Sequence, residues 1–347
     1  MIANNDYYNI LKYKFLSYYT EALLIAEGSI PYPRLATFHT NYICNYQCGD
    51  CKCSNSNTSY RKNITYSSAL KIINQLLKLN IKSIDFSGGG EPLLTPGIEK
   101  LLVFLKKKSI QIGLITNGYF LRGSLLNTAV ASASYIRIGL DASTPETYSK
   151  IKNTDKNNFS LVCSNIETAL RTRTQTVHGP EITLKFTLND LNVSELESMI
   201  FLSEKLGVDA VFVKPYENSV SPLKNAEKYE KKLQFLKKKY HDKLPIIGSL
   251  LNGCSPKAYC HFNPLQITVD MLGDIYICSY YEERKNSHKL GNIFSQDIKK
   301  IWFGKEHRYK IKNINMDICS KYSCKLHSAN YYLSNLITNS YNKLAFI

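Results

Sequence analysis

Three cysteines lie close together near the start of the chain, at Cys44, Cys48 and Cys51, in a C-x3-C-x2-C spacing. They come just after an apolar run that predicts a β-strand over residues 35–40. Three thiolates on one short loop can bind three irons of a [4Fe–4S] cluster and leave the fourth iron without a protein ligand. An iron with an open position can bind a small molecule, as the open position of a catalytic zinc does. The spacing therefore predicts a cluster that takes part in chemistry.

The same segment contains a fourth cysteine, Cys53, which leaves a structural zinc site of four thiolates as the alternative. Four cysteines this close together would strain a tetrahedral ion, and zinc sites usually pair two separated knuckles. We therefore favour the cluster and expect Cys53 to be a spare thiol.

The composition narrows the class of protein. The chain has 347 residues and ten cysteines, no apolar run long enough for a membrane helix, and no basic start of the kind that opens a signal peptide. We expect a cytoplasmic protein without a membrane partner, whose clustered thiols bind metal and do not form disulfides. The net charge of +16 includes short lysine runs typical of solvated helix faces, so we do not expect a nucleic-acid partner.

Short β-rich runs alternate with amphipathic stretches over residues 35–215. The predicted strands are Leu35–Thr40, Ile81–Phe86, Ile110–Thr116, Tyr135–Leu140, Ile182–Leu188 and Asp209–Lys214. The predicted helices are Thr65–Leu79, Ile98–Lys107, Phe159–Arg171, Val193–Leu206 and Leu223–Lys243. Because parallel strands need helical crossovers, this rhythm predicts a parallel α/β sheet with its active site at the carboxyl ends of the strands. The cysteine loop follows the first strand and so lies at that end.

Glycine and polar residues follow three more predicted strands. Ser87-Gly88-Gly89-Gly90-Glu91 follows the second, Thr116-Asn117-Gly118 ends the third, and Asp141 follows the fourth. On their own these segments predict a glycine turn, an Asn-Gly turn and the approach to the next helix.

A second group of cysteines lies in the last part of the chain, at Cys254, Cys260, Cys278, Cys319 and Cys324. Cys260 and Cys278 flank Gly273 in a C-x12-G-x4-C pattern, and residues 270–274 predict a hairpin turn. The change of character after residue 253 predicts a second, smaller, cysteine-rich domain, with a zinc ribbon as the alternative. Cys163 lies on the apolar face of a predicted helix and is expected to be a buried small hydrophobic residue.

The cysteine loop and the Gly-Gly-Glu segment together resemble the radical S-adenosylmethionine (SAM) enzymes. The resemblance implies a partial (β/α)6 TIM-like barrel over residues 35–222, preceded by a helix and linker over 1–34 and followed by a linker helix over 223–253. It implies that the SAM-binding [4Fe–4S] cluster is bound by Cys44, Cys48 and Cys51.

The same resemblance implies the SAM contacts. The methionyl amine is expected at Gly89, Gly90 and Glu91, and the pocket is expected to be lined by Asn117 and Asp141. The family usually has an aromatic or apolar residue before the third cysteine, near the adenine. Here that residue is Asp50, and Tyr46 is the candidate substitute.

The tail, residues 254–347, resembles the SPASM and twitch auxiliary-cluster domains of radical SAM enzymes. Its Gly291-Asn292-Ile293 and Ile301-Trp302 match segments common in these domains. The resemblance implies an auxiliary [4Fe–4S] cluster bound by Cys260, Cys278, Cys319 and Cys324, with Cys254 or His327 as a substitute ligand. Because the later cysteines of a full SPASM domain are absent, the tail looks like the shorter twitch type.

The resemblance also implies the reaction. SAM is cleaved with an electron from a flavodoxin- or ferredoxin-type donor, and the resulting 5′-deoxyadenosyl radical abstracts hydrogen from the substrate. An auxiliary cluster that accepts an electron would make this an oxidoreductase. Residues 1–34 are too few for an independent peptide-binding domain, so we expect a small polar metabolite such as a sugar or aminocyclitol. The alternatives are modification of a ribosomal peptide and, in another class, a zinc-holding nucleic-acid-binding protein; no catalytic residue or general base is assigned.

Overall fold

The computed structural model describes residues 17–49, 51, 63–176, 178–216, 223–251 and 259–320, together with 324, 330, 331, 333–335 and 337. Asp50, Cys53, Cys254 and His327, which carried predictions, lie outside the described residues. The chain divides into two compact units. The core unit consists of His39–Ser67 and Ile84–Leu251, and the tail unit consists of Met1–Phe38, Ser68–Ser83 and Asn252–Ile347.

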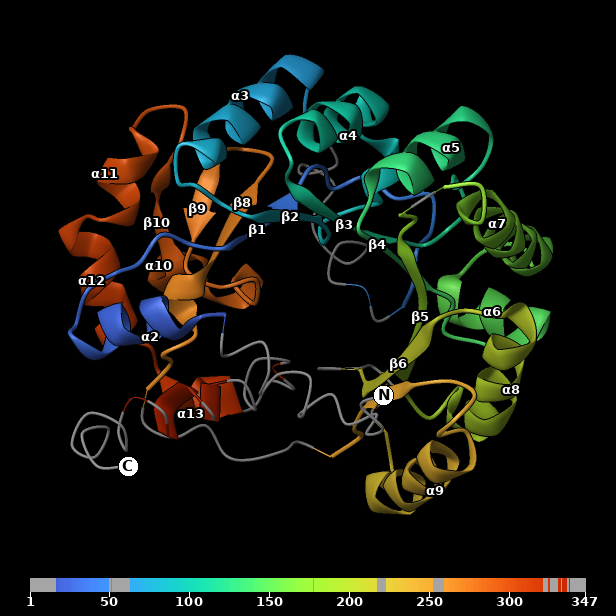
Figure 1. Ribbon diagram of the computed structural model, residues 1–347. Coiled ribbons are helices and arrows are strands. Elements are labelled where there is room, and N and C mark those ends of the chain that lie inside the picture. The colour runs from blue at the N-terminus through green and yellow to red at the C-terminus, as the bar shows by residue number, and fades with distance from the viewer. Residues whose placement is uncertain are drawn as a thin grey trace. The chain divides into compact units, whose positions relative to one another are not determined.

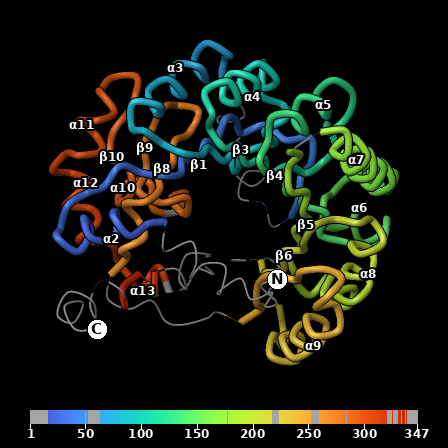
Figure 2. Tube along the Cα trace, viewed as in Figure 1, coloured from blue at the N-terminus to red at the C-terminus, as the bar shows by residue number. Residues whose placement is uncertain are grey.

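The core unit contains an open, curved parallel sheet (Figures 1 and 2). Its strands follow one another in chain order: β2 (Ser83–Phe86), β3 (Gln111–Thr116), β4 (Tyr135–Gly139), β5 (Glu181–Leu188), β6 (Ala210–Pro215) and β7 (Ile246–Gly248). The register is continuous, since Ile138 of β4 pairs with Leu184 of β5 and Phe186 of β5 pairs with Val213 of β6. All the carboxyl ends of these strands therefore lie on one side.

Helices cover the outer face of this sheet (Figure 1). They are α4 (Ile98–Lys107), α5 (Gly123–Ser132), α6 (Pro145–Lys152), α7 (Asn157–Arg173), α8 (Leu196–Leu206) and α9 (Ala226–Lys239). Short 3-10 turns precede α4 and α8, as η2 (Pro92–Leu94) and η3 (Val193–Glu195). The apolar face of α4 is fully buried, as its periodicity predicts, at Ile98, Leu101, Leu102 and Leu105.

The tail unit combines a meander of antiparallel strands with small helices. β1 (Leu35–His39) is followed in the strand order by β8 (Gln266–Asp270), β9 (Asp274–Tyr276) and β10 (Lys289–Asn292). The predicted hairpin turn is confirmed: β8 and β9 pair antiparallel, and Gly273 between them has a φ of 78°, which favours glycine. The helices and 3-10 turns are α2 (Tyr19–Ala26), α3 (Tyr66–Leu77), η4 (Asn263–Leu265), η5 (Glu282–Arg284), α10 (Lys285–His288), α11 (Ile298–Trp302), α12 (Lys305–Lys312) and α13 (Met316–Ser320).

The α/β class and the open parallel sheet agree with the prediction, and all six predicted strands are present with ends within two residues. The predicted helix over 223–243 is shorter, at Ala226–Lys239, and the one over 193–206 begins as a 3-10 turn. Helices α5 and α6 and strand β7 of the core unit were not predicted, nor were β10 and helices α10 to α13 of the tail unit. The predicted domain limits stay predictions. Within the residues described, no helix is long and apolar enough to cross a membrane.

Candidate active site and auxiliary cluster site

The cysteine loop begins on a platform made by the glycine segment. Gly90 N–H donates to the Asn41 carbonyl at 2.7 Å, and Glu91 N–H donates to the Ile43 carbonyl at 2.8 Å. The approach is so close that an added Cβ at Gly89 would clash with the Asn41 carbonyl oxygen, and one at Gly90 with the Ile43 carbonyl oxygen. The glycines are therefore required for the loop to dock, whether or not their backbone also contacts SAM.

Glu91 is buried, and its carboxylate connects the end of β2 to the end of β3. One oxygen accepts from Leu93 N–H at 3.1 Å and from the Thr116 hydroxyl at 2.6 Å; the other accepts from Asn117 N–H at 2.8 Å. Burial raises the pKa of this carboxyl group and these hydrogen bonds oppose the rise. The structure thus shows Glu91 as an organiser of the site, and its expected contact with the SAM amine stays a prediction.

Asn117 lies beside the first cysteine. Its Nδ2 is 3.7 Å from Cys44 Sγ and donates to Asn45 Oδ1 at 2.8 Å, while Tyr46 N–H reaches the same sulfur at 3.5 Å. The structure therefore brings Cys44, the end of β2 and the end of β3 together, as their positions after neighbouring strands predict.

Asp141 lies in a buried charged group at the ends of β4 and β5. Its carboxylate forms an ion pair with Lys152 and accepts from Thr187 N–H at 2.6 Å. The attraction of the Lys152 charge lowers the pKa of Asp141 against the opposing effect of burial, whereas burial lowers the pKa of the nearby Lys185. Both oxygens of the Asp141 carboxylate thus already have partners within the protein, and its expected place in the SAM pocket stays a prediction.

Lys152 connects this group to the cysteine loop. Gln47 N–H donates to the Lys152 carbonyl at 3.3 Å, and the Lys152 charge lowers the pKa of the Cys48 thiol, although burial has the larger, raising effect. Lys152 gave no signal in the sequence, because it lies at the end of α6 with no motif around it.

Tyr46, the candidate to contact adenine, is buried at 4% exposure. Its ring packs edge-to-face against the rings of Tyr119 and Tyr148, with distances between ring centroids of 6.0 and 6.1 Å. Its hydroxyl accepts a hydrogen bond from the Tyr148 hydroxyl at 3.0 Å. These contacts leave little of the ring accessible. Packing the back of the cysteine loop is the role the structure shows for it.

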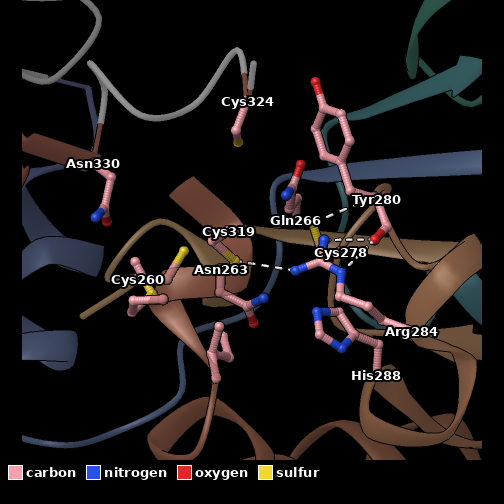
Figure 3. Close-up of a pocket in the computed structure, with 12 residues that line it drawn as sticks. Cys260, Asn263, Gln266, Cys278, Tyr280, Arg284, His288, Cys319, Cys324 and Asn330 are labelled. Carbon is pink, nitrogen blue, oxygen red and sulfur yellow. Dashed lines mark hydrogen bonds between the residues drawn. The ribbon is translucent and has the colours of Figure 1, made fainter. Parts of the chain in front are cut away.

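Four of the five tail cysteines, Cys260, Cys278, Cys319 and Cys324, line one pocket, shown in Figure 3. Cys278 follows β9, Cys260 precedes η4, Cys319 lies on α13, and Cys324 follows it. Burial raises the pKa of Cys260 to about 12, so loading metal there must displace a tightly held proton. The pocket thus brings together the four cysteines that are the predicted ligands of the auxiliary cluster.

Polar residues complete this pocket. Tyr280 N–H donates to Cys278 Sγ at 3.4 Å, and Arg284 Nη1 donates to Cys319 Sγ at 3.0 Å. His288 also lines it, and burial with the nearby Arg284 and Lys310 charges lowers its pKa to about 3, so its ring is neutral at pH 7. Arg284 and His288 were not predicted as part of the site, because no spacing in the sequence relates them to the cysteines.

The donor sets fit iron–sulfur clusters. In the described part of the chain, no three His, Cys, Asp or Glu side chains are grouped so that they could hold a single metal ion. The thiolates of a [4Fe–4S] cluster bind different irons and need not meet at one point. Three thiols at the carboxyl end of a parallel sheet and four around one pocket suit a cluster with an open iron and a fully ligated one. The assignment of individual ligands stays a prediction.

Fold and site together define an α/β iron–sulfur protein, and two family models match it. The Radical SAM superfamily model matches residues 39–194, and an iron–sulfur cluster-binding domain model, SPASM, matches residues 260–325. The chain therefore belongs to the radical SAM superfamily and carries a SPASM domain. It is an iron–sulfur enzyme with a SAM-binding [4Fe–4S] cluster and an auxiliary cluster.

Individual proteins resemble it over most of its length. The antilisterial bacteriocin subtilosin biosynthesis protein AlbA of Bacillus subtilis is 22% identical over 339 residues, which cover 91% of this chain and 71% of AlbA. A probable GTP 3′,8-cyclase of Saccharolobus islandicus is 24% identical over 285 residues, 76% of this chain and 89% of the cyclase. The crystal structure of Streptococcus suis SuiB bound to its precursor peptide SuiA superposes with a TM-score of 0.68 at 13% identity, covering 87% of this chain and 72% of SuiB.

Proposed function

We propose that this enzyme modifies a ribosomally made peptide by radical SAM chemistry. The observation that carries the proposal is the similarity to AlbA, a bacteriocin biosynthesis protein, because it extends over 91% of the chain. The fold shared with SuiB is compatible with this function, although at 13% identity it speaks for the fold alone.

The comparisons do not support the small polar metabolite that we expected as substrate. That expectation depended on the short segment before the core, and the relatives reported above are a bacteriocin biosynthesis protein and a cyclase. The cyclase similarity covers less of the chain, 76%, and makes GTP the second candidate substrate.

The residues of the core unit would hold the SAM-binding site in the following way. Cys44, Cys48 and Cys51 would bind the cluster, while the glycine segment and the Lys152 carbonyl fix the loop through backbone hydrogen bonds. When bound, cluster and SAM supply a carbon-centred radical that removes a hydrogen atom from the substrate. Asn117 lies beside Cys44 and would limit how ligands approach that side of the loop.

The tail cysteines would hold a cluster that serves as a one-electron acceptor. A peptide that loses one hydrogen atom, then one electron and one proton, is oxidised by two electrons in total. Loss of Cys278 or Cys319 should therefore abolish the oxidised product while SAM cleavage continues. Persistence of product in these variants would remove the acceptor role.

The test begins with anaerobic reconstitution with iron and sulfide. We expect about eight irons per chain and, with dithionite and SAM, release of 5′-deoxyadenosine. Peptides encoded by short reading frames beside the gene, and separately GTP, are then incubated with the reduced enzyme and SAM and followed by mass spectrometry.

A peptide that loses two hydrogen masses, with 5′-deoxyadenosine formed in step, supports the proposal. Turnover of GTP with no change in any peptide would replace the peptide by a nucleotide. The Cys44→Ala variant, which should form no 5′-deoxyadenosine, is the matched control for radical chemistry in either case.

A further inference from the structure

Arg284 is the one arginine among the residues that line the auxiliary pocket in the described part of the chain. Its Nη1 donates to Cys319 Sγ at 3.0 Å, and its Nε donates to the Tyr280 carbonyl at 2.9 Å (dashed lines in Figure 3). The backbone carbonyl thus fixes one edge of the guanidinium, so that the other edge points at the sulfur. The guanidinium is thus fixed by hydrogen bonds on two sides, to the Tyr280 carbonyl and to Cys319 Sγ.

The Arg284 contact matters because a thiolate-ligated cluster carries negative charge, to which a nearby cation is attracted. A cluster held by four thiolates is negatively charged, and its charge becomes more negative when it accepts an electron. A nearby cation and an N–H bond to a ligating sulfur stabilise the reduced form more than the oxidised form, which raises the reduction potential. The lining residues that the structure describes include no Asp or Glu.

The first cysteine site is different. The N–H groups that reach Cys44 Sγ belong to the Tyr46 backbone and the Asn117 amide, and both are neutral. Lys152, the cation whose charge reaches Cys48, is buried and forms an ion pair with Asp141. The two sites therefore differ in one contact: neutral N–H groups donate to Cys44 Sγ, whereas a charged guanidinium donates to Cys319 Sγ.

We propose that Arg284 is a positioning residue that raises the reduction potential of the auxiliary cluster through its charge and its hydrogen bond to Cys319. The chemical consequence, an auxiliary cluster poised to receive an electron from an oxidised peptide, rests on the proposed function. The potential does not depend on the substrate, so it can be measured whether or not the substrate is a peptide.

The experiment is a dye-mediated redox titration followed by electron paramagnetic resonance. A full-length Cys44→Ala/Cys48→Ala/Cys51→Ala background leaves only the auxiliary cluster. Into it are placed Arg284→Gln, which removes the charge, Arg284→Lys, which keeps the charge but not the fork, and Arg308→Gln. Arg308 is an exposed cation on α12 of the same unit and is the matched control.

We expect the midpoint potential to fall in Arg284→Gln, to fall by less in Arg284→Lys, and to be unchanged in Arg308→Gln. Equal potentials in Arg284→Gln and the parent would overturn the proposal. If Arg284→Gln fails to retain about four irons, the Arg284→Lys titration decides, and a potential equal to the parent's overturns the proposal as well. In the otherwise native chain, Arg284→Gln should release 5′-deoxyadenosine normally and form less product, which a purely structural role would not separate.

Discussion

Gly89 shows why one residue of the site can only be glycine. It has a φ of +67°, and an added Cβ would also clash with the Asn41 carbonyl that leads into the cysteine loop. Gly207, at the end of α8, has a similar φ of +78° but open space around the added atom. Comparing substitutions at Gly89 and Gly207 therefore distinguishes the effect of backbone strain, present at both, from that of a steric clash, present only at Gly89.

We therefore expect Gly89→Ala to lose the first cluster and Gly207→Ala to keep it. Both variants incur a left-handed backbone strain of about 1 kcal/mol, and only the first displaces the loop. Iron analysis after reconstitution should show about four irons fewer in Gly89→Ala. A full iron content in Gly89→Ala would show that the loop does not need the platform.

Glu91 offers a second test at the level of one residue. A glutamine at this position turns an NH2 group towards an N–H donor of Leu93 or Asn117, whichever way the amide is placed. We expect Glu91→Gln to lower the free energy of unfolding by about 1–3 kcal/mol, measured by urea denaturation. Glu146→Gln, an exposed change on α6, should stay within about 0.5 kcal/mol; equal effects would mean that the buried hydrogen bonds contribute little.

At the scale of elements, the buried charges join the end of β4 to the end of α6. Asp141→Asn keeps an acceptor for Thr187 N–H but leaves Lys152 and Lys185 without a carboxylate, whereas Lys152→Met leaves Asp141 still attracted by Lys185. We expect Asp141→Asn to lower the free energy of unfolding by about 3–5 kcal/mol and Lys152→Met by less.

Urea midpoints of the two variants and of Lys150→Met, an exposed change on the same helix, test this order. Lys150→Met should be nearly neutral. A larger loss in Lys152→Met than in Asp141→Asn would mean that Lys185 does not compensate for Lys152.

The sequence was a good guide to the strands and a poor one to the shorter elements. Apolar runs such as Ile182–Leu188 and strong periodicity such as that of α4 come from burial along a whole element, and they were read correctly. The helix α5 buries mainly small residues, and β7 has only three residues, so neither leaves a clear pattern.

The site divides in the same way. The cysteines and glycines of the site can be predicted from their residue types and spacing. The structure brings the glycine segment against the cysteine loop and places four tail cysteines around one pocket. Lys152 and Arg284 act on sulfurs that are distant in sequence, since Arg284 lies 35 residues from Cys319. Only the fold determines such contacts, because a cation near a thiolate has no fixed sequence separation.

At the scale of the whole molecule, each unit contains a buried histidine with a low pKa, in addition to His288 of the auxiliary pocket. Burial lowers the pKa of His39 in the core unit and of His307 in the tail unit to about 4. Both rings are neutral at pH 7. Below the ordinary histidine pKa of about 6.5, these two histidines bind protons in the unfolded chain. In the folded chain they stay neutral until about pH 4.

These histidines should therefore lower the stability as the pH decreases from 6.5 towards 4, by about 1.4 kcal/mol per pH unit for each. Asp270, whose pKa burial raises to about 6, opposes this fall below pH 6. Urea unfolding of the cluster-free protein at pH 7 and pH 5, at constant ionic strength, measures the change. The His307→Phe variant should reduce the pH dependence of the free energy of unfolding. An identical pH dependence in the variant would show that His307 titrates normally.

The way the cysteine loop is anchored also governs how its sequence can diverge. Its start is held by hydrogen bonds from Gly90 and Glu91 N–H, and its middle by the bond from Gln47 N–H to the Lys152 carbonyl, all between backbone atoms. Replacing the exposed Gln47 side chain leaves every one of these bonds in place. Variation across homologues should thus be permitted at an exposed loop position such as Gln47 and forbidden in Gly89 and Gly90, which face the loop.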